Sequence, residues 1–106
     1  MKWISNYVFI AGNKLKNQLV EIDKDSRLVK TTSLLDELAN TEYVPHALCV
    51  VSARRKRRLV SLFGRIASLA DFEQGFARLF ADDDTSKGRV VVAAIDFDDM
   101  RLIFLQ

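Results

Sequence analysis

Histidine and cysteine are nearly absent from this sequence, which contains one of each, His46 and Cys49. A single cysteine excludes an intramolecular disulfide, and its place in the apolar run 47–51 predicts a buried core thiol. A transition-metal centre needs three or four ligands. One histidine and one buried cysteine therefore predict that no such metal is bound. We expect His46 to lie at the entry to a strand and to be hydrogen-bonded to the backbone.

Long hydrophobic runs and a strong net charge are also missing. The longest apolar run, residues 90–95, is far shorter than the roughly 20 residues that span a bilayer. The N-terminal segment lacks the pattern of a secretory signal, so we expect a cytoplasmic protein without a membrane partner. The formal net charge of +2 argues against a general attraction to nucleic acid. With 49% hydrophobic and 28% charged residues, the 106 residues predict one folded domain, 1–106.

Much of the chain has the pattern of short strands joined by tight turns. Residues 3–10 are rich in aromatic and β-branched side chains, which suit a pleated, half-buried surface. Two further short strands, 18–22 and 27–31, follow at the spacing of a meander. Residues 47–51 are continuously apolar and predict a strand covered on both faces. The remaining predicted strands are 59–63, 89–95 and 100–105.

The best helical pattern spans residues 68–80. Its apolar side chains fall on one face at helical spacing: Leu69, Phe72, Phe76, Leu79 and Phe80. Ser68 and Asp71 resemble a capping box at the start, and Gly75 would allow close approach to a strand. A shorter helix, 34–40, is predicted after Ser33.

Together these patterns predict an α+β fold. We expect a β-dominated, mostly antiparallel sheet or small sandwich of six or seven short strands, with a main amphipathic helix (68–80) and a short helix (34–40). The main helix should cover one open face. Its phenylalanines 72, 76 and 80 are predicted to pack onto Val8, Ile10, Val50 and Val92.

A family resemblance covers roughly residues 3–53 and, more faintly, the C-terminal strands. The segment Lys16-Asn17-Gln18-Leu19-Val20-Glu21-Ile22-Asp23, followed by a polar turn and Arg27-Leu28-Val29, resembles the first strands of the accessory β-sandwich in the amidohydrolase superfamily. Residues 90–102 are similar to the closing strands of that sandwich. Gln18 and Ser26 stand where glycines are common in the family.

The same resemblance implies that the catalytic part of the family is missing. The family strand that matches residues 44–53 leads into a His-x-His pair that binds the catalytic metal, and the matching positions here are Val51 and Ala53. The catalytic barrel takes roughly 200 residues or more, which this chain does not have room for. The resemblance thus implies an accessory domain without the barrel, the metal ligands or a cofactor, and therefore not an enzyme.

Two acidic clusters are candidate sites. Asp96-Phe97-Asp98 follows an apolar strand and resembles the Asp-x-Asp motif of haloacid dehalogenase phosphatases, but only seven residues follow Asp99 in this sequence. We therefore expect a polar hairpin turn and not a phosphatase site. Asp82, Asp83 and Asp84 lack the spacing of a calcium loop and predict a solvated turn.

The sharpest charge feature is a run of five basic residues: Arg54, Arg55, Lys56, Arg57 and Arg58. Because so many charges cannot be buried, we expect a loop or hairpin tip. Three interpretations stay open: a solvated turn paired with residues 82–84, a site for nucleic acid or another polyanion, or a subunit contact. Arginine offers phosphates a planar fork of donors. The run contains no aromatic residue on which bases could stack, so we expect weak, non-specific nucleic-acid binding.

The sequence favours two hypotheses for function. The first is a non-catalytic interaction or scaffold protein, which binds a protein partner or associates with itself as a homodimer to cover the edge strands of a small sheet. The alternative is a small polyanion- or nucleic-acid-binding protein that uses the basic run 54–58.

Overall fold

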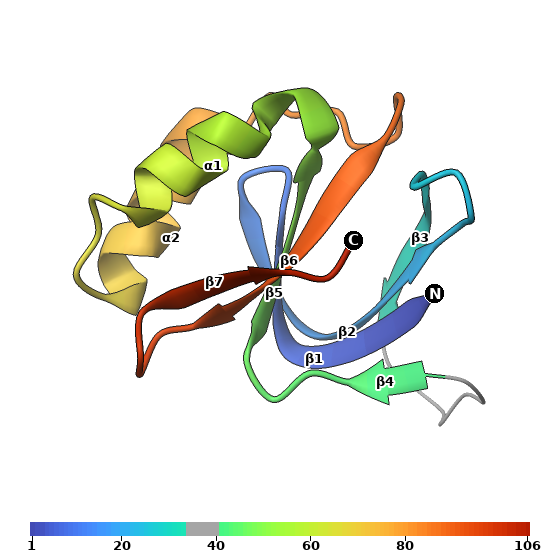
Figure 1. Cartoon of the computed structure of the whole chain (residues 1–106), viewed down its shortest axis with the longest axis horizontal. Helices are drawn as coiled ribbons and strands as arrows, with labels where there is room; N and C mark the ends of the chain where they lie inside the picture. The colour runs from blue at the N-terminus through green and yellow to red at the C-terminus, as the bar shows by residue number, and fades with distance from the viewer. Residues whose placement is uncertain (34–40) are drawn as a thin grey trace.

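The computed structural model describes residues 1–33 and 41–106 (Figure 1). The predicted α+β class, with a mostly antiparallel and β-dominated sheet, is confirmed, whereas the predicted helix 34–40 lies outside the described residues. In chain order the elements are β1 (Lys2–Ile10), β2 (Asn13–Ile22), β3 (Leu28–Ser33), β4 (Thr41–Tyr43), β5 (Ala47–Ser52), a 3₁₀ turn (Ala53–Arg55), α1 (Lys56–Phe63), α2 (Leu69–Phe80), β6 (Val90–Asp96) and β7 (Arg101–Phe104).

The strands form one mixed sheet in the order β3-β2-β1-β5-β6-β7. Strand β1 has two parallel neighbours on one side: its residues 2–4 pair with β4 and its residues 8–10 pair with β5. The other strand pairs are antiparallel. The link between β4 and β5 contains Pro45, which has no amide hydrogen for a sheet ladder. The link therefore interrupts the pairing along β1.

Helices α1 and α2 cover one face of the sheet with an aromatic cluster. Phe72, Phe76 and Phe80 of α2 are fully buried. The ring centroids of Phe72 and Phe76 lie 5.5 Å apart, and those of Phe76 and Phe80 lie 4.9 Å apart. Phe9 of β1 meets Phe72 edge-on at 4.9 Å, a favourable geometry for aromatic pairs.

The opposite face of the sheet curls on itself (Figure 1). The β2–β3 turn meets the start of β6, where the Val90 amide donates to the Ser26 carbonyl at 2.7 Å. The Gln106 side chain donates to the Ser26 hydroxyl oxygen at 2.7 Å. A second apolar core fills the inside of the curl, with buried side chains from Trp3, Val8, Ile10, Val20, Ile22, Val44, Leu48, Val50, Val90, Val92 and Ala94.

The helix aromatics pack onto a different set of strand residues from the one predicted. The predicted partners, Val8, Ile10, Val50 and Val92, lie inside the curl. The observed partners are residues on the alternate face, including Phe9, Cys49, Val51 and Ile95. Every residue of β5 is buried, as predicted for a continuous apolar strand. Because such a strand is apolar on both faces, its pattern does not reveal which face a helix covers.

The predictions for residues 54–63 are wrong. In place of a loop or hairpin tip at 54–58 and a strand at 59–63, the chain forms the 3₁₀ turn and helix α1. Leu59 and Leu62, three residues apart, are the buried side of this helix. A five-residue, mostly apolar segment fits a strand and a helix turn equally well, and arginine and lysine are good helix formers.

Helix α2 begins as predicted. The Asp71 amide donates to the Ser68 hydroxyl oxygen at 3.3 Å, and the Asp71 carboxylate accepts from the Ala67 amide at 3.2 Å. Gly75 allows a close approach, but to a helix and not to a strand. A Cβ atom on Gly75 would lie 2.5 Å from Leu62 Cδ1 of α1. The glycine thus sets how closely α1 and α2 pack.

We predict that Phe76→Ala lowers the free energy of unfolding by about 3–5 kcal/mol, the usual cost of truncating a buried phenylalanine. Phe76 is fully buried between two other rings, so the cavity would have little chance to collapse. Chemical denaturation measures the change. Leu69→Ala, in the same helix but 36% exposed, is the control and should cost much less. Equal losses for the two variants would contradict this account of the core.

Candidate functional site

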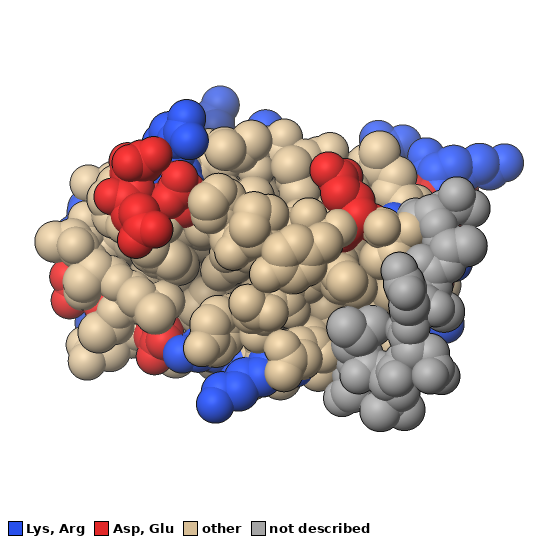
Figure 2. Space-filling model, turned by 90° about the horizontal axis from the view of Figure 1, so that it is seen from below, with Lys and Arg blue, Asp and Glu red and all other residues tan. Residues whose placement is uncertain are grey.

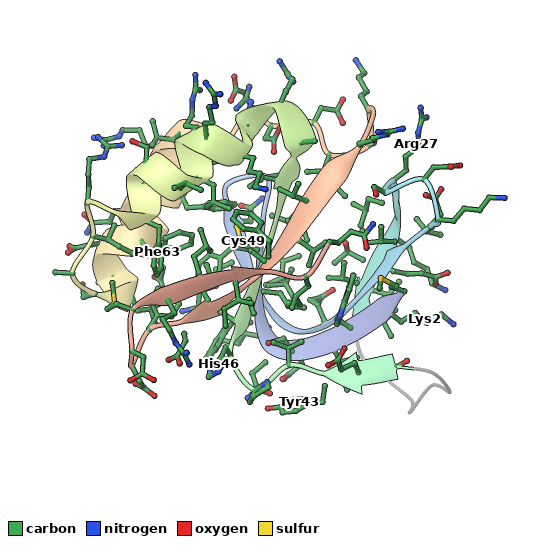
Figure 3. All side chains as sticks on the ribbon, in the orientation of Figure 1. Lys2, Arg27, Tyr43, His46, Cys49 and Phe63 are labelled. Carbon is green, nitrogen blue, oxygen red and sulfur yellow. The ribbon has the colours of Figure 1, made fainter. Side chains whose placement is uncertain are left out.

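The residues of the basic run occupy the 3₁₀ turn and the first turn of α1. Arg54, Lys56, Arg57 and Arg58 are exposed. Nitrogen-tipped side chains project outward along the α1 edge of the molecule in Figure 3. The Lys56 ammonium lies over the Phe104 ring of β7, 4.4 Å from its centroid. Arg54, Arg57 and Arg58 are thus exposed to solvent, whereas Lys56 also contacts a ring of the sheet.

Arg55 differs from its neighbours because it is paired. Its Nη1 atom lies 2.9 Å from Asp82 Oδ1, and its Nε atom lies 3.6 Å from Asp83 Oδ1. The hydrogen bond and charge of Arg55 lower the pKa of Asp82, and the same hydrogen bond raises the pKa of Arg55. Among the described residues, Arg55 is the member of the basic run within ion-pair distance of the acidic loop, and the charge of Arg58 also lowers the pKa of Asp82. We infer that Arg55 has a structural role.

Asp83 is buried, which corrects our prediction of a solvated turn for residues 82–84. Its side chain accepts from the Ser52 amide at 3.0 Å and from the Ser52 hydroxyl at 2.6 Å. These bonds and Arg55 provide the partners that a buried carboxylate requires. Burial, helped by the charge of Asp83, raises the pKa of the Cys49 thiol well above its usual value. Cys49 is therefore the buried core thiol that we predicted.

The start of α1 has an unfavourable distribution of charge. The Ser52 hydroxyl donates to Asp83, and no side chain caps the 3₁₀ turn or α1. The first turn of α1 contains no acidic residue. Because the amino end of a helix carries partial positive charge, each basic side chain there destabilises the helix by up to about 1 kcal/mol.

Charge is also segregated along the chain: residues 53–67 hold six of the sixteen basic residues and none of the fourteen acidic ones.

A groove of about 220 Å³ between α1 and α2 brings two more arginines together. Arg65 follows α1, Arg78 belongs to α2, and both line this groove with Gln74 and Asp71. Residues 54, 57, 58, 61 and 65 lie at offsets of 0, 3, 4, 7 and 11, the spacing of one helix face, and they run from the 3₁₀ turn through α1 to the turn that follows it. We define the basic surface as Arg54, Arg57, Arg58, Arg65 and Arg78.

The arginines of the basic surface have no ion-pair partner within the part of the chain that the structure describes. Sequence reasoning found Arg54, Arg57 and Arg58 but missed Arg65 and Arg78. Residue 65 lies at helical spacing from residues 54, 57, 58 and 61, so its place on this surface could be predicted once α1 is recognised as a helix. The contribution of Arg78 depends on how two helices pack, which the sequence pattern does not indicate.

A second concave site lies at the other end of β5. A pocket of about 190 Å³ opens between β1, the β4–β5 link, the start of α2 and the β6–β7 turn. Asp96 in its wall is buried, with 6% of its side chain exposed. Its Oδ1 atom accepts from the amides of Asp98 and Asp99 at 3.0 and 3.1 Å. These bonds confirm the hairpin turn that we predicted for the acidic residues here.

The second carboxylate oxygen of Asp96 has two side-chain neighbours at longer range. Its Oδ2 atom lies 3.7 Å from His46 Nε2 and 3.5 Å from Arg101 Nη2. The pKa of Asp96 is lowered, chiefly by the Asp99 amide and also by His46. The prediction for His46 was a bond to backbone. Its carbonyl does accept from the Ser5 hydroxyl, but its ring faces a carboxylate.

Comparisons of this chain with protein-family models, with curated proteins and with solved structures found no match. The resemblance to the amidohydrolase superfamily therefore stays a prediction. Val51, at one of the two metal-ligand positions of that family, is buried, and Ala53, at the other, is exposed. Within residues 1–33 and 41–106, the structure contains no cluster of three or more histidine, cysteine or acidic side chains placed for a metal ion. No described helix is long and apolar enough to cross a membrane.

We predict that Ser52→Ala lowers the free energy of unfolding by about 1.5–3 kcal/mol, because it removes a hydrogen bond to a buried charged group. The bond from the Ser52 hydroxyl to Asp83 is 2.6 Å long and buried. Ser61→Ala is the matched control, since Ser61 is an exposed serine of α1. It should change stability by less than about 0.5 kcal/mol. Chemical denaturation of both variants is the measurement, and an unchanged Ser52→Ala variant would contradict the role given to Asp83.

Proposed function

We propose that this protein is a non-catalytic interaction protein that binds the phosphate backbone of nucleic acid through its basic surface. The observation that carries this proposal is a group of five exposed arginines on one helical layer, none paired with a carboxylate among the described residues. Arginine presents several donors in a planar fork, which matches phosphate oxygens. An array of such groups releases counterions from a polyanion, and this release is the main source of sequence-independent affinity.

The position of these charges on α1 supports a binding role over a solvated surface. Acidic residues would be more stabilising at the amino end of a helix. Basic residues in this position lower the stability of the unbound protein. They attract an anion, because the helix amides and the arginines both carry positive charge toward it. Local rules of stability are commonly broken at functional sites.

The chemistry of the surface favours duplex over single-stranded nucleic acid. The exposed residues of α1 are basic, aliphatic or small and include no aromatic ring: Lys56, Arg57, Arg58, Val60 and Ser61. Proteins that bind single strands without sequence preference use aromatic side chains on which bases stack. A surface of arginines without such rings contacts phosphates and does not read bases. The proposed binding is therefore independent of sequence and falls with salt.

The proposal is tested with a fluorescently labelled duplex of mixed sequence, followed by fluorescence anisotropy over a range of salt concentrations. We expect a Kd in the non-specific range, about 10⁻⁴–10⁻⁶ M at physiological salt. Replacing Arg54, Arg57 and Arg58 with serine should weaken binding. It should also reduce the slope of log K against log salt by about 0.9 for each phosphate that the variant no longer neutralises.

The control removes the same number of positive charges from another face. Lys16, Lys24 and Arg27 are exposed on β2 and the β2–β3 turn, and their side chains form no ion pair with described residues. Replacing these three residues with serine should preserve most of the affinity for the duplex and most of the slope of log K against log salt. If the two triple variants had equal effects, binding would depend on the net charge alone, which would contradict the proposal. Tighter binding to poly-glutamate than to the duplex would instead indicate an acidic protein partner.

A further inference from the structure

The pocket beside His46 lies at the opposite end of β5 from the basic surface. His46 directly precedes β5, and the 3₁₀ turn of the basic run directly follows it. Six residues of strand separate the two sites by about 20 Å. Figure 3 shows His46 low in the molecule, well away from α1 at the upper edge. The pocket is therefore a separate site, and its ligand is independent of the proposed function.

The walls of this pocket combine apolar rings with carboxylates. Tyr7, Pro45, Leu69 and Phe97 provide apolar surface, and the Tyr7 and Leu69 side chains at the rim are 37% and 36% exposed. Asp96, Asp98 and His46 also line the pocket. No lysine or arginine lines it among the described residues, although Arg101 Nη2 lies 3.5 Å from Asp96 Oδ2. Figure 2 shows acidic side chains gathered at the end of the molecule that holds the β6–β7 turn. A concave apolar site with a few converging polar groups is the usual form of a ligand site.

Asp96 retains the capacity to accept a further hydrogen bond. Its Oδ1 atom accepts from two amides, whereas the side-chain nitrogens nearest to Oδ2, those of Arg101 and His46, lie at 3.5 and 3.7 Å. Charge-assisted hydrogen bonds are usually about 2.7–2.9 Å long. A buried carboxylate oxygen in a pocket wall, with partners only at longer range, suits a ligand that donates an N–H group.

The aromatic wall also suits a cation. The Lys14 ammonium already lies 4.7 Å from the centroid of the Tyr7 ring, and the same ammonium pairs with Glu73 at 2.6 Å. Aromatic faces attract positive groups in this way. An anionic ligand would instead face the charges of Asp96 and Asp98 at short range, which is unfavourable.

We propose that this pocket binds a small organic cation, a primary ammonium group attached to an apolar body. The ammonium would lie against Asp96 Oδ2 and the Asp98 carboxylate, and the apolar body would contact Tyr7, Leu69 and Phe97. Such a cation occurs as a free amine or as a lysine side chain of a peptide. The recognition chemistry is the same for both.

The proposal is tested by saturation-transfer NMR titrations of the full chain with benzylamine and with benzyl alcohol, its neutral counterpart. We expect saturable binding of benzylamine with a Kd near or below about 10 mM, a modest value for so small a ligand. Benzyl alcohol should bind at least about tenfold more weakly, because the charged contact is worth roughly this factor or more. Equal binding of the two compounds, or no binding of benzylamine, would overturn the proposal.

Three substitutions at the end of β6 and in the turn that follows it identify the site. Asp96→Asn keeps an oxygen that can accept from the amides of residues 98 and 99 but removes the charge. Asp98→Asn removes an exposed charge in the pocket wall and should not affect folding. Each should weaken benzylamine binding by about tenfold. Asp99→Asn is the matched control, since Asp99 belongs to the same turn but does not line the pocket. An equal loss of affinity with Asp99→Asn would refute the site.

One further titration distinguishes the two sources of the cation, a free amine and a lysine side chain. The doubly capped dipeptide N-acetyl-Phe-Lys-amide carries its only ammonium on the lysine side chain. Binding at least as tight as that of benzylamine would support the pocket and identify a peptide side chain as its occupant. Weaker binding than benzylamine would also support the pocket and identify a free amine. In both cases the same loss of affinity with Asp98→Asn is required, and its absence would contradict the proposal.

Discussion

A buried carboxylate, Asp83, fixes the junction from which the proposed binding surface extends. It accepts two hydrogen bonds from Ser52 at the end of β5 and lies beside the guanidinium of Arg55. Asp83 belongs to the loop that follows α2, 31 residues along the chain from Ser52. One side chain thus joins the end of a central strand, the entry to α1 and the exit from α2. A charge in that position is tolerated only because each of these partners is present.

This junction determines which side chains of the basic run have a carboxylate within ion-pair distance. Arg55 is held by Asp82 and Asp83, so it belongs to the fold. Its neighbours on the solvent face of α1 have no carboxylate within ion-pair distance among the described residues, and they stand at the positive end of a helix. The small net charge of the chain conceals this segregation, because the acidic residues lie elsewhere in the sequence. The local field above α1, and not the net charge, is what a polyanion would meet.

Much of the fold follows from periodicity, and most errors arise where periodicity is ambiguous. The helix at 68–80 is predictable because its phenylalanines fall on one face and Ser68 caps its start. The strand β5 is predictable as doubly covered, but its uniform apolar run hides which face meets the helices. The run 59–63 is too short to distinguish a strand from a helix. The burial of Asp83 and the arrival of Arg78 beside Arg65 depend on tertiary packing, for which the sequence carries no local signal.

The central claim is that nucleic acid meets this protein at α1. Its most direct test is to map backbone amide signals by two-dimensional ¹H–¹⁵N NMR while a short mixed-sequence duplex is added to the folded protein. We predict that the shifted signals fall within residues 53–67 and around Arg78, and that they return toward their free positions as salt is raised. Signals that shift mainly in β2 and β3, or that do not shift at a duplex concentration of about 1 mM, would contradict the account.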